Sequence, residues 1–202
     1  MKIGFFMGSF DPIHIGHINM IRAALAWVDK IIVVPSGHNP WKEDEPAPFK
    51  LRMEMIAAAI KPFGERVEVS DIESTFEPPF YANKPLNYFR AKFPNDNLVI
   101  ICGSDTADKI PLWKNASYDI LPFYRILSIE REYQGMHKSG NDWQRRWVED
   151  PDGKKYEYEH IFIHPFPVSS TYIRRVVKEG GVTYPLIPIE VDKIIKDNNL
   201  YK

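Results

Sequence analysis

Short apolar runs alternate along most of the chain with longer segments in which apolar residues recur at helical spacing. Apolar runs of roughly four to eight residues bounded by turn residues are typical of buried strands, and amphipathic segments are typical of helices. Their alternation predicts an α/β fold in which helices flank a parallel sheet. The expected strands are residues 3–7, 30–35, 67–69, 98–102, 124–129 and 160–164, and the expected helices are residues 15–28, 49–60, 86–93, 170–178 and 189–198.

The segment 131–159 departs from this alternation because it is dense in charged, glycine and aromatic residues. It contains Asp150-Pro151-Asp152-Gly153, a strong turn signal with aromatic residues on both sides, which predicts a surface hairpin. A solvated insertion or a partner contact is the alternative. We expect one domain over residues 1–202 that carries an insertion at about 130–158, with two small lobes as the other arrangement that the length allows.

Composition and charge narrow the function classes. The chain has 202 residues and a formal net charge of −1, which gives no electrostatic case for nucleic acid or an anionic membrane as the main partner. Its single cysteine excludes an internal disulfide framework and suits a reducing cytoplasm. No window approaches about eighteen uninterrupted apolar residues. We therefore expect a cytoplasmic protein, and the sequence leaves open whether its copies form a homo-oligomer.

Two histidines follow the first expected strand, in the stretch Gly8-Ser9-Phe10-Asp11-Pro12-Ile13-His14-Ile15-Gly16-His17. Gly8 lets the backbone approach a ligand closely, and Asp11-Pro12 favours a turn. His14 and His17 then fall on one face of the first helical turn, where unpaired N–H groups and the helix dipole favour an anion. This placement predicts a phosphate site; a zinc half-site and a capping cluster without chemistry are the alternatives.

A second polar cluster opens the expected helix at 170–178. Ser169 or Ser170 is suited to the N-cap, and Arg174 lies one turn further on, where its planar guanidinium can reach phosphate oxygens. Taken alone, the segment also fits a capped amphipathic helix. Together with the two histidines, it predicts a second phosphate-binding element.

The two motifs, in this order, resemble those of the HxGH nucleotidylyltransferases, which transfer a nucleotidyl group from a nucleoside triphosphate and release pyrophosphate. Four further segments are similar to the nicotinate (or nicotinamide) mononucleotide adenylyltransferases. They are the loop 34–42, the helix start 49–55, the segment Gly103-Ser104-Asp105 with Pro111-Leu112-Trp113 after it, and the stretch 186–201 that ends in Leu200-Tyr201.

This resemblance implies a Rossmann-like nucleotidylyltransferase fold and adenylyl transfer from ATP to a pyridine mononucleotide, with a dinucleotide and pyrophosphate as products, in NAD biosynthesis. It implies catalysis by His14, His17 and Arg174. The residues that it assigns to ATP are Gly8, Ser9, Phe10, His14, His17, Lys42, Gly103, Asp105, Ser170, Thr171 and Arg174. The residues that it assigns to the mononucleotide are Ser9, Phe10, Tyr81, Asn83, Lys84 and Trp113.

Elementary chemistry agrees with several of these roles. Asp105 follows a parallel strand, where a carboxylate can accept hydrogen bonds from ribose hydroxyls or cap a helix. Trp113 can stack on a pyridine ring or pack in the core. Mg²⁺ would enter with ATP, held mostly by phosphates and water, so no metal-ligating residues are assigned. The alternatives are transfer to another phosphate acceptor, such as phosphopantetheine, and a non-catalytic nucleotide-binding protein on the same fold.

The chain departs from the family pattern at three places. Met7 stands where a glycine is usual, and Trp41 stands where a histidine is usual. The segment 79–86 occupies the place of a Tyr-Thr-x-x-Thr-Leu motif that recognises the pyridine carboxylate in the nicotinate enzymes; Tyr81 matches the tyrosine, but the threonines are absent. The choice between the acid and the amide acceptor therefore stays open.

Overall fold

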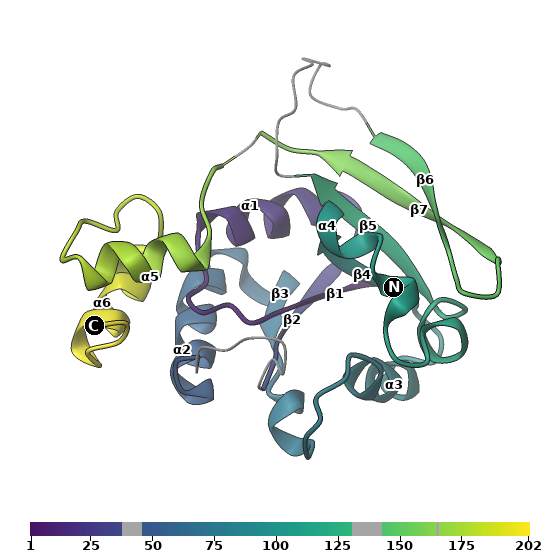
Figure 1. Cartoon of the computed structure of the whole chain (residues 1–202), viewed down its shortest axis with the longest axis horizontal. Helices are drawn as coiled ribbons and strands as arrows, with labels where there is room; N and C mark the ends of the chain where they lie inside the picture. The colour runs from purple at the N-terminus through teal and green to yellow at the C-terminus, as the bar shows by residue number, and fades with distance from the viewer. Residues whose placement is uncertain (38–45, 131–142, 165) are drawn as a thin grey trace.

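The computed structural model describes residues 1–37, 46–130, 143–164 and 166–202, and within them a sheet is flanked by helices (Figure 1). The strands are β1 (Lys2–Gly8), β2 (Lys30–Pro35), β3 (Val67–Val69), β4 (Asn97–Gly103), β5 (Tyr124–Glu130), β6 (Trp143–Glu149) and β7 (Lys155–Phe162). The α-helices are α1 (Ile15–Ala24), α2 (Phe49–Ile60), α3 (Asn83–Lys92), α4 (Ser104–Ala107), α5 (Ser170–Lys178) and α6 (Ile189–Asp197). Shorter helical turns are η1 (Lys61–Arg66), η2 (Ile72–Thr75), η3 (Ile110–Leu112) and η4 (Ala116–Ile120).

The strands of the described residues form one sheet in the order β3-β2-β1-β4-β5-β7-β6. Every neighbouring pair is parallel except β6 and β7, which are antiparallel. The chain builds outward from β1 through β2 to β3, and then returns to the other side of β1 with β4. The carboxyl ends of β1 and β4 therefore flank the point where the strand order reverses, which is where open α/β sheets bind ligands.

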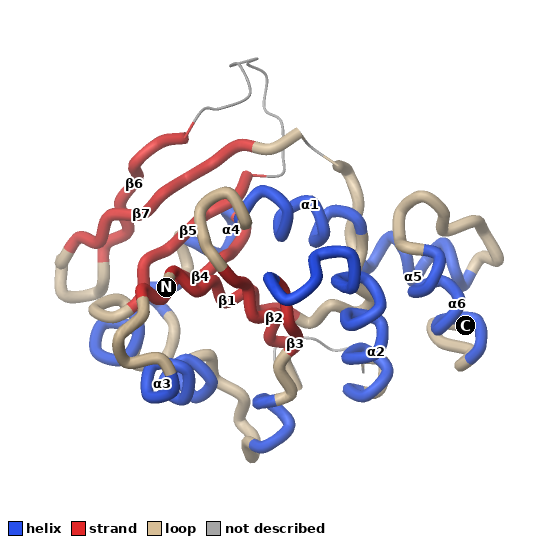
Figure 2. Tube along the Cα trace, turned by 180° about the vertical axis from the view of Figure 1, so that it is seen from behind, coloured by secondary structure: helices blue, strands red, loops and turns tan. Residues whose placement is uncertain are grey.

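Each face of the sheet is covered by its own set of helices. Side chains alternate along β1, so that Phe6 packs with α1, α2, α5 and α6 while Phe5 packs with α3 and the turns η3 and η4. Figure 2 shows α3 across the strands from these other helices. The fully apolar strands predicted at 30–35 and 98–102 are buried because both of their faces are covered in this way.

The predicted hairpin is confirmed and joins the main sheet. The turn at Asp150 and Gly153 connects β6 to β7, and β7 pairs with β5 in parallel. Because β7 pairs along β6 as well as β5, it begins at Lys155 and ends at Phe162, earlier than the strand expected at 160–164. The rest of the expected insertion, 131–142, lies outside the described residues, and its status as an insertion stays a prediction.

The predicted helices agree with the structure to within a few residues. α2 spans the predicted range, whereas α1 ends at Ala24 because Ala26 and Trp27 form tighter bonds to Ala23 and Ala24 instead of continuing the helix. In the part of the chain that is described, no helix is long and apolar enough to cross a membrane.

Candidate active site

The two histidines cap the helix that follows them. His14 is the N-cap of α1: its Nδ1 accepts a hydrogen bond from the backbone N–H of His17 at 3.4 Å, and His17 Nδ1 accepts one from the backbone N–H of His14 at 3.3 Å. The rings are stacked with their centroids 3.6 Å apart. Since both Nδ1 atoms accept, each neutral ring carries its hydrogen on Nε2. The cap thus uses one nitrogen of each ring, and the other nitrogen carries an N–H of the kind that phosphate oxygens accept.

Close packing fixes the position of these rings. A Cβ on Gly16 would lie 3.0 Å from two atoms of the His14 ring and 3.2 Å from Val168 Cγ1, so any larger residue would have to displace the ring or Val168 slightly. Phe10 is 2% exposed, has a positive φ of 47° and sets its ring edge-on to His17 at 5.0 Å. The histidine pair is therefore held by the core and by the segment before α5.

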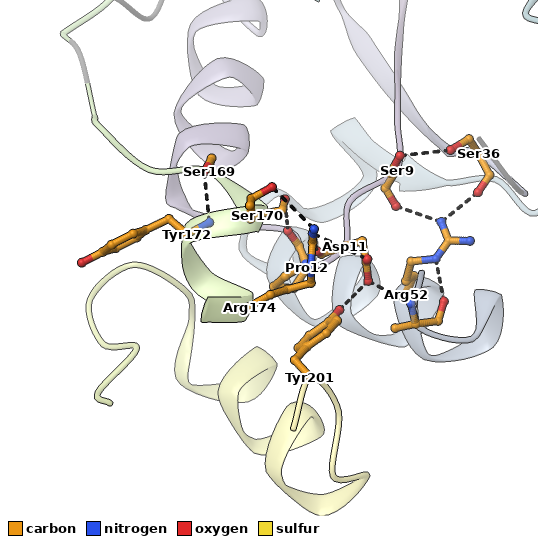
Figure 3. A network of polar contacts seen from close by, with 12 residues as sticks. Ser9, Asp11, Pro12, Ser36, Arg52, Ser169, Ser170, Tyr172, Arg174 and Tyr201 are labelled. Carbon is orange, nitrogen blue, oxygen red and sulfur yellow. Dashed lines mark hydrogen bonds and ion pairs between the residues drawn. The ribbon is translucent and has the colours of Figure 1, made fainter. Parts of the chain in front are cut away.

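The start of α5 is joined to the loop between β1 and α1 (Figure 3). Ser169 is the N-cap, because its Oγ accepts from the backbone N–H of Tyr172 at 3.1 Å. Ser170 Oγ donates to the Pro12 carbonyl at 2.9 Å, and Arg174 Nη1 donates to the Asp11 carbonyl at 2.9 Å. The ends of two helices that favour anions thus meet at one loop, beside an arginine and two histidines.

A cavity of about 920 Å³ opens where β1, β2 and β4 end. This cavity, the strand-end pocket, is within the size range of small-molecule sites, about 300–1,000 Å³. Tyr81 and Trp113 give it aromatic surfaces, and Lys114 Nζ lies 4.4 Å from the centre of the Tyr81 ring. Its lining residues are Met7, Gly8, Ser9, Ser36, Glu73, Phe80, Tyr81, Ala82, Ile100, Ile101, Cys102, Thr106, Lys109, Leu112, Trp113 and Lys114.

A buried arginine ties the loops of this pocket together. Arg52, on α2, is 1% exposed and donates from Nη1 to the carbonyls of Ser9 and Ser36, both at 2.8 Å. It also donates to the carbonyls of Gly37 and Ala47, both at 2.9 Å. Burial lowers the pKa of this guanidinium. Loops that follow β1 and β2 are therefore fixed relative to each other by one side chain.

The pocket also holds a buried carboxyl group. Glu73 is 3% exposed, and its Oε2 accepts from the backbone N–H of Gly37 at 3.5 Å. Burial raises the pKa of Glu73, since desolvation disfavours its charged form. The ionised form of Glu73 is thus less favourable here than it would be for an exposed glutamate.

A family model described as cytidylyltransferase-like matches residues 5–176. The chain belongs to this family. Among its relatives, "Probable nicotinate-nucleotide adenylyltransferase" of Clostridium tetani is 34% identical over 206 residues, covering 100% of this chain and 99% of that one. "Nicotinate-nucleotide adenylyltransferase" of Bacillus subtilis is 31% identical over 204 residues, covering 100% and 98%. The chain is thus one of the nicotinate-nucleotide adenylyltransferases, which are nucleotidyltransferase enzymes.

A solved structure shares the fold of this cytidylyltransferase-like protein. It is the Plasmodium falciparum nicotinic acid mononucleotide adenylyltransferase complexed with NaAD, with a TM-score of 0.73, 21% identity, and coverage of 99% of this chain and 97% of that one. The predicted Rossmann-like nucleotidylyltransferase fold is confirmed.

The structure brings together part of the site predicted for a family member. Gly8, Ser9, Tyr81 and Trp113 line the strand-end pocket. Phe10 is buried and its ring packs against His17, so its contact with a ligand stays a prediction.

Two residues expected at the mononucleotide lie outside the lining of the pocket. Lys84 Nζ donates to the Glu77 carbonyl at 2.7 Å, and Asn83 Nδ2 donates to Asp119 Oδ2 at 3.2 Å. Both residues lie in the first turn of α3, which begins at Asn83, and their side chains contact neighbouring segments there. The structure thus places both residues outside the lining of the pocket, and their contact with the mononucleotide stays a prediction.

The remaining predicted residues lie at the edge of the sheet. Gly103 ends β4 and is the N-cap of α4, and Asp105 is exposed in the first turn of α4. Thr171 is exposed at the start of α5, and its Oγ1 accepts from Arg174 Nη2 at 3.5 Å. Lys42 and Trp41 lie outside the described residues. The ligand contacts of all these residues stay predictions.

Sequence reasoning missed the side chains that hold the site in place, above all Arg52. A signal was present, because Arg52 lies three and four residues before Met55 and Ile56, on the apolar face of the predicted helix. A charged residue on such a face is buried with partners when the helix packs. No comparable local signal marks Glu73, Asp11 or Tyr201.

Proposed function

We propose that this enzyme transfers the adenylyl group of ATP to nicotinate mononucleotide, giving the dinucleotide and pyrophosphate. The single observation that carries this proposal is the strand-end pocket, because its Gly8–Ser9 edge belongs to the same segment that leads into the histidine pair. An aromatic pocket for a flat ring therefore adjoins a set of donors for phosphates. The names of the relatives, nicotinate-nucleotide adenylyltransferases, support the same acceptor.

The reaction needs alignment and charge stabilisation rather than a base. An oxygen of the acceptor phosphate, already ionised near neutral pH, attacks the α-phosphorus of ATP. The bond to the bridging oxygen breaks, and pyrophosphate leaves with the electron pair. The Nε2–H groups of His14 and His17 would stabilise the charge that gathers on the α-phosphate. Ser170, Thr171 and Arg174 would hold the β- and γ-phosphates.

The donor set of the site fits a metal that arrives with its substrate. The described residues contain no group of three or more His, Cys, Asp or Glu side chains that could hold an ion. The site instead offers N–H and hydroxyl donors, which suit phosphate oxygens. Mg²⁺ bound to ATP through phosphates and water would add positive charge at the triphosphate without ligands from these residues.

The charges of the strand-end pocket favour the acid over the amide. Two lysines, Lys109 and Lys114, line it, against one carboxyl residue, Glu73. A carboxylate on the pyridine ring would be attracted by both lysines, whereas a neutral amide would not.

A comparison of three acceptors tests the proposal. The enzyme is incubated with ATP, Mg²⁺ and one of three acceptors, nicotinate mononucleotide, nicotinamide mononucleotide or phosphopantetheine, and pyrophosphate and the adenylylated product are measured. We expect turnover with the nicotinate form at a kcat/KM at least tenfold above that of the amide. Turnover only with phosphopantetheine, or ATP binding without turnover of any acceptor, would contradict the proposal.

A matched pair of variants tests the basis of acid selection in the same assay. Lys114→Met removes a charge from the pocket, and Lys92→Met removes one from the exposed end of α3, where Nζ lies 5.7 Å from the centre of the Tyr88 ring. We expect Lys114→Met to raise KM for the nicotinate form several-fold with little change for the amide. Lys92→Met should leave both values unchanged.

A further inference from the structure

One buried carboxylate connects three parts of the chain at the phosphate side of the site (Figure 3). Asp11 is 6% exposed, and its Oδ1 accepts hydrogen bonds from the Tyr201 hydroxyl at 2.6 Å and from the backbone N–H of Ala47 at 3.1 Å. Its Oδ2 lies 3.7 Å from Arg174 Nη1, while its own backbone carbonyl accepts from that nitrogen at 2.9 Å. Asp11 is thus held by Tyr201 and Ala47 on one side and faces Arg174 on the other.

Tyr201 makes this contact from an unfavourable backbone conformation. Its φ is 63°, in the left-handed region that residues other than glycine rarely adopt. Burial and the neighbouring Asp11 carboxylate raise the pKa of the Tyr201 hydroxyl, so the group keeps its proton and acts as the donor. An unfavourable backbone that delivers one hydroxyl to one carboxylate points to a defined role for that bond.

The distance of 3.7 Å between Asp11 Oδ2 and Arg174 Nη1 indicates what the bond from Tyr201 to Asp11 controls. It is longer than a hydrogen bond, so the Asp11 carboxylate and Arg174 attract each other without closing into a paired fork. Without the Tyr201 hydroxyl, Asp11 Oδ1 would keep only the backbone N–H of Ala47 as a hydrogen-bond donor among the described residues, and the carboxylate could rotate toward the guanidinium. A closed ion pair would then compete with a phosphate for the same N–H groups.

We propose that Tyr201 is a positioning residue for the nucleotide site: by holding the Asp11 carboxylate in place, it keeps the Arg174 guanidinium oriented toward a bound triphosphate. The inference rests on the proposed function only in that Arg174 binds ATP. Tyr201 itself touches no substrate in this scheme and acts through Asp11.

The test is the affinity for Mg²⁺-ATP, measured by calorimetric titration in the absence of any acceptor. Tyr201→Phe removes a single oxygen, and we expect it to weaken ATP binding five- to tenfold while KM for the acceptor stays unchanged. Tyr156→Phe is the matched control, because it removes a tyrosine hydroxyl that donates to another carboxylate, Asp150 Oδ2 at 3.2 Å, in the β6–β7 hairpin. It should leave ATP affinity unchanged.

A double-mutant cycle separates this role from a purely structural one. If Tyr201 acts through Arg174, Tyr201→Phe should change ATP affinity less than twofold when Arg174 is already lysine. A full effect in the Arg174→Lys background would overturn the proposal. So would unchanged ATP affinity in Tyr201→Phe alone, whether or not its melting temperature falls.

A second variant covers the case in which Tyr201→Phe does not fold. Asp11→Asn keeps an oxygen for Tyr201 and Ala47 but removes the charge that competes for Arg174, so ATP should bind more tightly; weaker binding would contradict the scheme. If the wild type binds ATP but adenylylates no acceptor, the proposed function fails and this inference stands on its own binding data. If the wild type does not bind ATP, both are wrong.

Discussion

The two nitrogens of each active-site histidine have separate tasks. In His17, Nδ1 accepts the backbone N–H of His14 and so stabilises the start of α1, while Nε2 carries the hydrogen that the proposed chemistry needs. The motif is therefore a helix cap and a candidate phosphate site at once. The sequence leaves these two roles open as alternatives, but different nitrogens of one ring can serve both.

Two substitutions of His17 should separate these tasks. In His17→Asn the amide oxygen can replace Nδ1 as the acceptor, so stability should change by less than about 0.5 kcal/mol while kcat falls on the order of a hundredfold. In His17→Ala both nitrogens are lost, so kcat should fall at least as far and the lost cap should also cost about 1 kcal/mol. Urea denaturation and initial rates measure both quantities. An equal loss of stability in the two variants would contradict the division.

At the scale of the elements, the sequence predicts what repeats locally. The apolar run that becomes β2 and the amphipathic segment that becomes α2 carry their periodicity within a dozen residues or fewer, and both spans match the structure. The start of α3 could not be placed in this way, because Asn83 and Lys84 are fixed by Asp119 and the Glu77 carbonyl. Contacts between elements decide such cases.

The close approach of α1 to the segment before α5 gives a prediction about packing. Gly16→Ala introduces a better helix former, worth roughly 0.5–1 kcal/mol, but its Cβ would meet the His14 ring and Val168. We expect stability to change little and kcat to fall at least tenfold, because a displacement of the ring by about 1 Å misaligns it. Arg22→Ala, on the exposed side of the same helix, should keep full activity. Normal turnover in Gly16→Ala would show that the tight fit does not matter.

For the molecule as a whole, a buried histidine should set how stability responds to pH. His160 on β7 is 0% exposed, lies 3.0 Å from Ser128 Oγ through Nδ1, and has Glu130 Oε2 at 3.8 Å from Nε2. Burial, together with the positive charge of Arg146, lowers its pKa below the ordinary value of 6.5. At acidic pH, His160 therefore binds a proton more readily in the unfolded chain than in the folded one.

The free energy of unfolding should therefore fall as pH drops below about 6.5, by up to about 1.4 kcal/mol per pH unit from this one group. The raised pKa of Glu73 changes the free energy of unfolding with pH in the opposite direction, but it does so equally in the wild type and in His160→Gln. Urea unfolding of the wild type and of His160→Gln between pH 5 and 7.5 measures the difference. A variant whose stability follows pH as steeply as the wild type would exclude His160 as the cause.

The sequence predicts the motif residues of the candidate site but not the residues that hold them in place, because these come from distant parts of the chain. Local spacing in a motif marks the residues proposed to contact ligands, as with His14, His17 and Arg174. The groups that hold them, Asp11 and Tyr201, meet across 190 positions of sequence, and no local pattern encodes such a meeting. Folding alone brings them together.

The same long separations decide when the site exists during synthesis. The bonds from Ser170 to Pro12 and from Tyr201 to Asp11 span 158 and 190 positions. A chain growing on a ribosome completes β1 and its capped histidines early, yet it lacks α5 and Tyr201 until nearly all of these residues have emerged. A prematurely terminated product would thus display the histidine motif without Arg174, the residue proposed to bind the phosphates of ATP.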